Sequence, residues 1–371
     1  MIYFDNAATT YPKPDCVYKA IEIGMQKYSF NAGRGRYEAA QETYNMIEET
    51  REMLGSIVGV SGNKVIFTSS ATESLNNILY GLDLHENDVV FISPFEHNAV
   101  ARTLHHLGVK LEFIPFDKVT WELDEKRYKD LLLLYKPKAV VISHVSNVTG
   151  YELPYKKIFD ATKCIDSVNI LDCSQSFGVY NISKESIDYV VFAGHKSLYA
   201  MFGIAGYICT SSHKLNVHKV GGTGSDSLNL NMPDYGVSRY EAGSLNSVGI
   251  YSIHESLGFL KENDFESKKM ELTSFLIDEL NEIEGVTLYL PENKKTKGIV
   301  SFNIEGYSSA DVGEILANDY DICVRTGYHC APFIHDFIGS KLYAGTVRVS
   351  LSGFNTKEEI DELISAIQEL I

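Results

Sequence analysis

Between residues 65 and 209 the sequence alternates short apolar runs with segments of helical periodicity, and this alternation limits the possible folds more than any other feature. Seven runs have the length and the β-branched or aromatic character of strands: Val65–Thr68, Val89–Ile92, Leu111–Ile114, Ala139–Ser143, Ile170–Asp172, Tyr189–Phe192 and Ala205–Cys209. Segments with apolar residues at every third or fourth position separate most of them. Strands alternating with helices predict an α/β fold, a large domain whose mainly parallel seven-stranded sheet lies between helices.

The rest of the chain predicts a second, smaller domain. Its 371 residues exceed the size at which a single core stops growing. After the glycine-rich loop Gly221–Ser225 the pattern is irregular to about Ser247, and the last ~110 residues combine shorter strands with amphipathic helices. We expect a large domain of residues 15–250 and a small α+β domain of residues 1–14 and 251–371, with residues 1–14 as an irregular lead-in.

Composition excludes several classes of protein. A net charge of −16 argues against a nucleic-acid partner, which usually leaves a basic footprint. The first residues have no basic n-region, and no apolar run reaches about 18 residues, so neither a signal peptide nor a membrane span is expected. The six cysteines form no Cys-x-x-Cys pair, which argues against a zinc site or a disulfide framework. Free thiols are typical of the reducing cytoplasm, so we expect a cytoplasmic protein, and we expect no bound metal.

Lys196 follows the apolar run Val190–Phe192 and the residues Gly194 and His195. In α/β proteins ligands bind at the carboxyl ends of strands, where this lysine would lie. Desolvation there lowers the pKa of a lysine and lets it form a Schiff base with a carbonyl compound. A solvated loop charge is the alternative, and the segment around Lys196 does not decide between them.

Other polar residues follow the strands in the same way. Ser70, Ala71 and Thr72 open a helix that either is simply capped or binds an anion. His97 is either a polar loop residue or a group that stacks on a ring. Asp172 ends a strand as a helix cap or as a buried carboxylate. Together with Gln175 and Lys196, these groups are what pyridoxal 5'-phosphate requires: a phosphate site, a ring platform, an acid, an amide and a Schiff-base lysine.

Seven ordered motifs resemble the cysteine desulfurase and selenocysteine lyase family, which has the class V aminotransferase fold. The likeness covers nearly the whole chain, and its last motif resembles the short-loop branch. The motifs are Tyr3–Thr9 (YFDNAAT), Phe67–Glu73 (FTSSATE), Glu96–Asn98 (EHN), Ser146–Gly150 (SNVTG), Asp172–Ser176 (DCSQS), Gly194–Lys196 (GHK) and Arg325–Cys330 (RTGYHC).

The resemblance implies a cofactor role for ten residues. Lys196 would hold the cofactor and move protons, Asp172 would pair with the ring nitrogen, and Gln175 would contact the phenolic oxygen. His97 would stack on the ring and take part in catalysis, and Ala71, Thr72 and His195 would bind the phosphate. Asn147 would lie beside the cofactor. Thr223 and Ser244 would reach the cofactor of the partner subunit in a homodimer.

The C-terminal motif implies the reaction. Cys330 would be the sulfur-accepting nucleophile, although a buried structural thiol is the alternative; Cys323 reads as a core residue. Because the thiolate is the reactive form, cations at Arg325 and His329 would assist Cys330. Arg348 would bind the substrate carboxylate bidentately, with Asn147 and Arg325 beside it.

The activity implied is that of a cysteine desulfurase, which moves sulfur from L-cysteine to Cys330 as a persulfide and releases L-alanine. A sulfur-acceptor protein, and through it sulfur mobilisation such as iron–sulfur cluster assembly, would follow. Selenocysteine lyase activity, another class V aminotransferase or C–S lyase reaction, and a scaffold that has lost turnover are the alternatives.

Four parts of the sequence depart from the family pattern. Ala193 replaces a serine that contributes to the phosphate site, and Ser244 replaces a threonine. The segment Ser197–Phe202 lacks the usual Gly-Pro, and Gly33 and Tyr37 stand where relatives carry histidines beside Asn31, Arg34 and Gly35. Fewer phosphate ligands imply weaker cofactor binding, and the altered early turn leaves the substrate open.

Overall fold

The structure is a computed structural model that describes residues 1–32, 35–224, 228–293 and 296–371. Gly33 and Arg34 of the early turn, and Ser225 of the glycine-rich loop, lie outside the described residues.

The large sheet has seven strands in the order β2-β8-β7-β6-β5-β3-β4. The strands are β2 Val65–Thr68, β3 Val89–Ile92, β4 Lys110–Phe113, β5 Ala139–Ser143, β6 Val168–Asp172, β7 Tyr189–Ala193 and β8 Ala205–Cys209. Only β8 runs antiparallel to its neighbours β2 and β7. The predicted α/β fold and its mainly parallel sheet are therefore confirmed, with strand ends within two residues of those expected.

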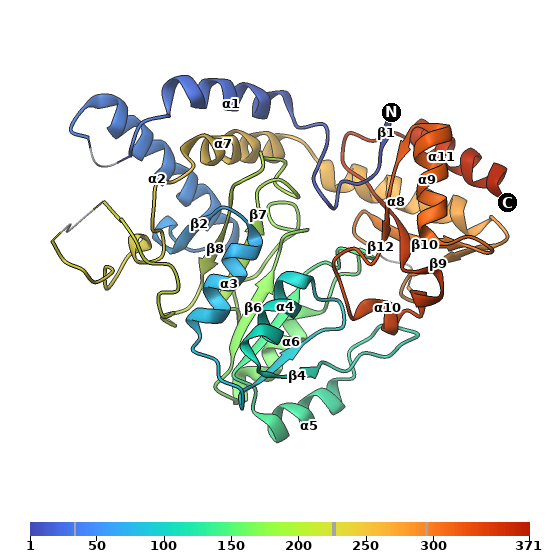
Figure 1. The fold of residues 1–371 in the computed structure, drawn as a ribbon, viewed down its shortest axis with the longest axis horizontal. Helices are drawn as coiled ribbons and strands as arrows, with labels where there is room; N and C mark the ends of the chain where they lie inside the picture. Colours follow the sequence, from blue (N-terminus) through green and yellow to red (C-terminus); the bar gives the residue numbers. More distant parts are fainter. Residues whose placement is uncertain (33–34, 225–227, 294–295) are drawn as a thin grey trace.

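Helices cover both faces of this sheet (Figure 1). They are α1 Asp15–Lys27, α2 Glu38–Val58, α3 Ala71–Gly81, α4 Asn98–Leu107, α5 Glu125–Tyr135, α6 Tyr155–Ala161 and α7 Ser247–Glu262. Strand β7 shows how the two faces are filled. Val190 and Phe192 belong to the core cluster that includes residues of α2 and α7, while Tyr189 and Val191 belong to the cluster that includes residues of α3 and α4. Alternate side chains of a strand point to opposite faces, so a strand buried on both faces is apolar throughout.

The C-terminal residues form a separate four-stranded antiparallel sheet, ordered β12-β13-β10-β9. Its strands are β9 Val286–Leu288, β10 Ile299–Ile304, β12 Arg325–Gly327 and β13 Thr346–Ser350, and the nearby helices are α8 Phe265–Asn281, α9 Ser309–Tyr320, α10 Ile334–Phe337 and α11 Lys357–Leu370. A third apolar cluster joins this sheet to α8, α9 and α11. The domain boundaries proposed from the sequence remain a prediction.

The N-terminus contributes to this second region. Strand β1 (Ile2–Tyr3) pairs in parallel with β11 (Ile322–Cys323), so the expectation of an irregular lead-in is wrong for these two residues. The pairing joins residues more than 300 positions apart, which no local pattern reveals. Among the helices of the described ranges, none is long and apolar enough to cross a membrane.

Candidate active site

One cavity lies at the carboxyl edge of the large sheet and gathers the predicted cofactor contacts. Its lining residues are Ser70, Ala71, Thr72, Leu75, His97, Ala99, Ser143, Val145, Asn147, Asp172, Ser174, Gln175, Ala193, His195 and Lys196. Eight of the ten residues predicted to contact the cofactor are among them. Their convergence follows from parallel strands, whose carboxyl ends meet at one edge.

Lys196 lies just beyond β7, after a turn that only glycine fits. A Cβ on Gly194 would lie 2.6 Å from the carbonyl oxygen of Ile204. Burial lowers the pKa of the Lys196 ammonium; the charge of Asp172 opposes this shift, and the charges of Arg348 and Arg325 add to it. No hydrogen bond or ion pair involving its amine is recorded within the described part of the chain. A desolvated, unpaired amine is suited to bond a carbonyl carbon.

Asp172 ends β6 as a fixed carboxylate. The backbone N–H and the hydroxyl of Ser174 both donate to its Oδ1, at 2.9 and 2.5 Å. The residue is 7% exposed, and among the described residues none donates a hydrogen bond to its other oxygen. Asp172 is thus held as a buried acid with one oxygen free to accept a proton donor such as a pyridinium N–H.

His97 is the N-cap of α4, and its orientation follows from that role. Its Nδ1 accepts a hydrogen bond from the backbone N–H of Ala99 at 3.0 Å. Burial, followed by the charge of Lys196, lowers the pKa of His97 to about 4. The ring is therefore neutral at physiological pH, as a group that stacks on a cofactor ring should be.

The N-terminus of α3 and His195 also line the cavity. Ser70 caps α3 by accepting from the N–H of Glu73, while Ala71 and Thr72 occupy the first turn, where N–H groups have no intrahelical acceptor. The Nδ1 of His195 is buried without a partner, and its ring stacks on Phe202 with centroids 4.6 Å apart. Unfilled N–H donors at a helix N-terminus, an orphaned ring nitrogen and an unpaired lysine fit pyridoxal 5'-phosphate.

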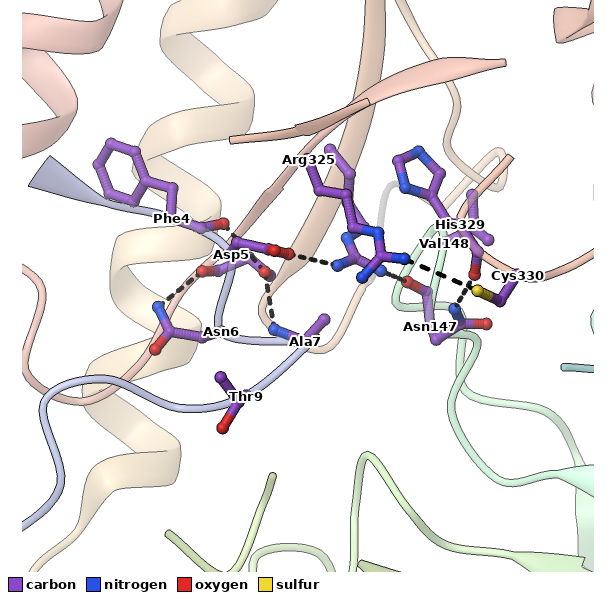
Figure 2. Close-up of polar contacts among 12 residues, drawn as sticks. Phe4, Asp5, Asn6, Ala7, Thr9, Asn147, Val148, Arg325, His329 and Cys330 are labelled. Atoms are coloured by element: carbon purple, nitrogen blue, oxygen red, sulfur yellow. Dashed lines mark hydrogen bonds and ion pairs between the residues drawn. The ribbon is translucent and has the colours of Figure 1, made fainter. Parts of the chain in front are cut away.

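The second half of the site comes from the small sheet. Arg325 on β12 lies directly opposite Arg348 on β13, so both side chains leave the same face of the sheet. The guanidinium of Arg325 donates to the sulfur of Cys330 at 3.6 Å, and Figure 2 shows the two side chains pointing toward each other. Cys330 is exposed, so its thiol can meet both a substrate and an external acceptor.

Arg348 is 1% exposed and makes only part of its possible hydrogen bonds. Its Nη2 donates to the carboxylate of Asp5 at 2.5 Å, and its Nη1 donates to the carbonyl of Asn147 at 2.7 Å. Its Nε is buried without a partner. An unsatisfied guanidinium N–H is costly in isolation, so this donor suits a missing acceptor such as a carboxylate.

The structure contradicts the expectation that a cationic His329 assists Cys330. His329 is 3% exposed, and its Nε2 lies 2.8 Å from the hydroxyl of Thr346. Burial and the charge of Arg348 hold its pKa well below the ordinary value, so the ring is neutral. Its carbonyl instead accepts a hydrogen bond from the amide of Asn147 at 2.7 Å (Figure 2). His329 therefore fixes the loop, and Arg325 is the cation in contact with the thiol.

The remaining predicted residues divide into two groups. Gln175 lines the cofactor cavity and donates from its amide to the carbonyl of Ala7 at 2.8 Å. Thr223 and Ser244 instead line a separate cavity together with Asn31. Within this single chain they do not join the group around Lys196.

Sequence reasoning left two functional positions without a role, although both stand in quoted motifs. Asp5 is the ion-pair partner of Arg348. Glu96 is fully buried; burial raises its pKa to about 8 against hydrogen bonds from Ser93 and Ser143, so its carboxyl is protonated at neutral pH. Glu96 joins the end of β3 to Ser143 at the end of β5 and so supports the adjacent His97. A charged residue four positions after an apolar strand, next to His97, was the available signal for Glu96.

Comparisons with known proteins agree with this geometry. The family model described as "Aminotransferase class-V" matches residues 2–363. A probable cysteine desulfurase of Methanothermobacter thermautotrophicus is 26% identical, over 100% of this chain and 94% of the relative. A probable cysteine desulfurase of Halalkalibacterium halodurans is 29% identical, over 100% and 93%. The apo structure of a cysteine desulfurase from Thermococcus onnurineus NA1 superposes with a TM-score of 0.89 at 29% identity, covering 100% of this chain and 94% of that one.

Proposed function

We propose that this chain, which belongs to the class-V aminotransferase family, is a pyridoxal-phosphate-dependent cysteine desulfurase. One observation carries the proposal. An exposed cysteine thiol contacts a guanidinium on the strand pair that also bears the buried Arg348. The charges of Arg325, Arg348 and Cys330 all act on the amine of Lys196, so the four side chains belong to one centre.

The residues of the large sheet would hold the cofactor. Lys196 would bond its carbonyl carbon, Asp172 would accept from the ring nitrogen, and the neutral His97 would stack on the ring. The N-terminus of α3 and His195 would take the phosphate, with Gln175 near the phenolic oxygen. When bound, pyridoxal phosphate supplies an electron sink for a substrate carbon.

The substrate would bind between the two sheets. The free Nε–H of Arg348 suits the carboxylate of L-cysteine; Asn147 accepts a hydrogen bond from Arg348, and Arg325 is its cross-strand neighbour. The Lys196 amine would move the proton from the substrate Cα. Asp5 and Asn147 hold the guanidinium of Arg348, so that it need not reorganise to bind a carboxylate.

Sulfur transfer would be the task of Cys330. Its thiolate attacks the substrate sulfur, an S–S bond forms, and the Cβ–S bond breaks. The electron pair of the broken bond stays with the carbon skeleton, which takes up a proton at Cβ and leaves as L-alanine. The exposed position of Cys330 then allows a second thiol to collect the persulfide sulfur.

Four further properties belong to this proposal. Thr223 and Ser244 would complete the phosphate site of a partner subunit in a homodimer, since they lie apart from the Lys196 cavity of their own chain. An acceptor protein would receive the sulfur for sulfur mobilisation, for example iron–sulfur cluster assembly. The protein would act in the cytoplasm, as its free cysteines suggest. It would need no metal ion.

Incubation of the purified holoenzyme with L-cysteine tests the function. We expect alanine to form in a one-to-one ratio with enzyme persulfide plus released sulfide, measured by amino-acid analysis and intact mass. Pyruvate or another keto acid in place of alanine would contradict the proposal and indicate β-elimination or transamination. Turnover of selenocysteine with none of cysteine would assign the chain to selenocysteine lyases. Absence of any borohydride-reducible bond at Lys196 would instead support a scaffold role.

A further inference from the structure

The carbonyl oxygen of His195 receives hydrogen bonds from several donors of the N-terminal segment. The ammonium of Lys13 lies 2.9 Å from it, the backbone N–H of Thr10 donates at 3.1 Å, and the hydroxyl of Thr9 donates at 3.1 Å. The Thr10 hydroxyl lies 3.3 Å away and also accepts from Lys13 at 2.8 Å. This carbonyl belongs to the peptide group that joins His195 to Lys196. Because that group is planar, fixing its oxygen fixes the position of the Lys196 Cα.

Lys13 is an unusual donor for this task. The ion pairs recorded within the described ranges include none with Lys13, so its charge is compensated by oxygen dipoles rather than by a carboxylate. Burial lowers the pKa of Lys13 to about 7. Its ammonium also lies 6.0 Å from the ring centroid of Phe202, which stacks on His195. Placing a cation here without a counter-ion has a desolvation cost, which a purely structural contact would not require.

The same N-terminal segment reaches the substrate side of the site. Asp5 binds Arg348, and the Asn6 amide donates to the carbonyl of Ser350 on β13 at 2.9 Å. The carbonyl of Ala7 accepts from Gln175 in the cofactor cavity. Along residues 5–13, the chain therefore contacts first Arg348, then Gln175, and finally the peptide group that precedes Lys196. The contact made by Lys13 is the last of the three.

We propose that Lys13 is a positioning residue, which holds the His195–Lys196 peptide through its hydrogen bond and so aims the Lys196 amine at the cofactor carbonyl carbon. The inference rests on the pyridoxal-phosphate part of the proposed function and is independent of which amino acid is the substrate. Lys13 does not line the cofactor cavity and acts only through the peptide it binds. The carbonyl of Lys196 itself accepts a hydrogen bond from the N–H of Tyr199 at 2.9 Å. The peptide groups before and after the Lys196 Cα are therefore both held.

Two variants of Lys13 and a matched control test this role. Lys13→Met keeps the length of the side chain and removes the ammonium, whereas Lys13→Arg restores a cation. Lys19→Met removes an exposed lysine from α1, the helix that begins two residues after Lys13, and is the control. Each full-length apoprotein is titrated with pyridoxal phosphate to obtain Kd, and bound cofactor is examined by visible circular dichroism. The borohydride-reduced bond at Lys196 is quantified by mass, and the apoprotein Tm reports folding.

We expect Lys13→Met to raise the Kd about tenfold, to weaken the circular dichroism of bound cofactor and to reduce the trapped fraction, because the hydrogen bond to the His195 carbonyl is lost. Apoprotein Tm should change little, kcat should fall more than KM rises, and Lys13→Arg should recover Kd to within about threefold of wild type. A Lys13→Met protein that matches Lys19→Met in Kd and circular dichroism would overturn the inference. Equal losses in Lys13→Met and Lys13→Arg would also overturn it. If the wild type itself formed no reducible bond at Lys196, the proposed function would fail, and this inference with it.

Discussion

The edge of the large sheet and the facing strands β12 and β13 contribute different halves of the site and are built in different ways. At the large sheet Asp172 and His97 are held by near neighbours in sequence: Ser174 donates to Asp172, and Ala99 donates to His97. On β13, Arg348 depends on Asp5, 343 residues away, and on Asn147, 201 residues away. Asp172 and His97 are therefore oriented locally, whereas Arg348, like the Lys196 peptide held by Lys13, is fixed only when distant segments meet.

The two halves also differ in how charge is balanced. The large-sheet groups are a buried lysine and a neutral histidine around one acid. Beside the small sheet, Arg325 contacts an exposed thiol, and Arg348 opposite it forms an ion pair with a partly buried carboxylate. The first arrangement suits a phosphorylated aldehyde, and the second suits an amino-acid carboxylate and a thiolate.

The largest expected effect comes from the large sheet. Lys196→Ala should lower kcat by at least about 10²–10⁴-fold, since it removes the group proposed to transfer the α-proton. It should also abolish the borohydride-reducible bond between residue 196 and the cofactor, so that cofactor attachment and turnover are lost together. Alanine formation from L-cysteine and intact mass after reduction measure the two effects. A Lys196→Ala enzyme whose cofactor is still trapped on another lysine would contradict the assignment of Lys196 as the residue that bonds the cofactor.

A smaller and more selective effect is expected from the small sheet. Arg348→Lys should lower kcat/KM for L-cysteine by about 10–100-fold, because an ammonium cannot reproduce the fork of charged hydrogen bonds. Cofactor affinity and the trapped bond at Lys196 should remain close to wild type, which would separate the two halves experimentally. Steady-state kinetics and a cofactor titration are the measurements. Equal damage to cofactor binding would show that the halves are not independent.

Much of the large-sheet half could be predicted from the sequence. Periodicity placed all seven strands, and polar residues after apolar runs identified Asp172, His97 and Lys196, because parallel strands bring their ends to one edge. The same logic could not find Lys13 or Asp5. Both act through contacts with residues more than 180 positions away, and neither stands at the end of a large-sheet strand.

His329 and Phe202 show two further limits of sequence reasoning. His329 precedes Cys330 in the chain, yet its ring turns toward Thr346 and is neutral, since adjacency along a backbone does not decide side-chain direction. Phe202 stands in the segment that departs most from the family pattern. The structure places its ring against His195, a packing contact that a motif comparison cannot provide.

Cys330→Ala tests the separation of the two halves most directly, with Cys164→Ala, which removes another exposed cysteine, as the control. Both variants are loaded with pyridoxal phosphate, given L-cysteine, and examined for alanine, for persulfide by peptide mass, and for the reducible bond at Lys196. We expect Cys330→Ala to keep the bond at Lys196 and to lose the persulfide and at least about 100-fold of alanine formation, while Cys164→Ala behaves as wild type. Wild-type turnover by Cys330→Ala, or persulfide on a different cysteine, would contradict the account.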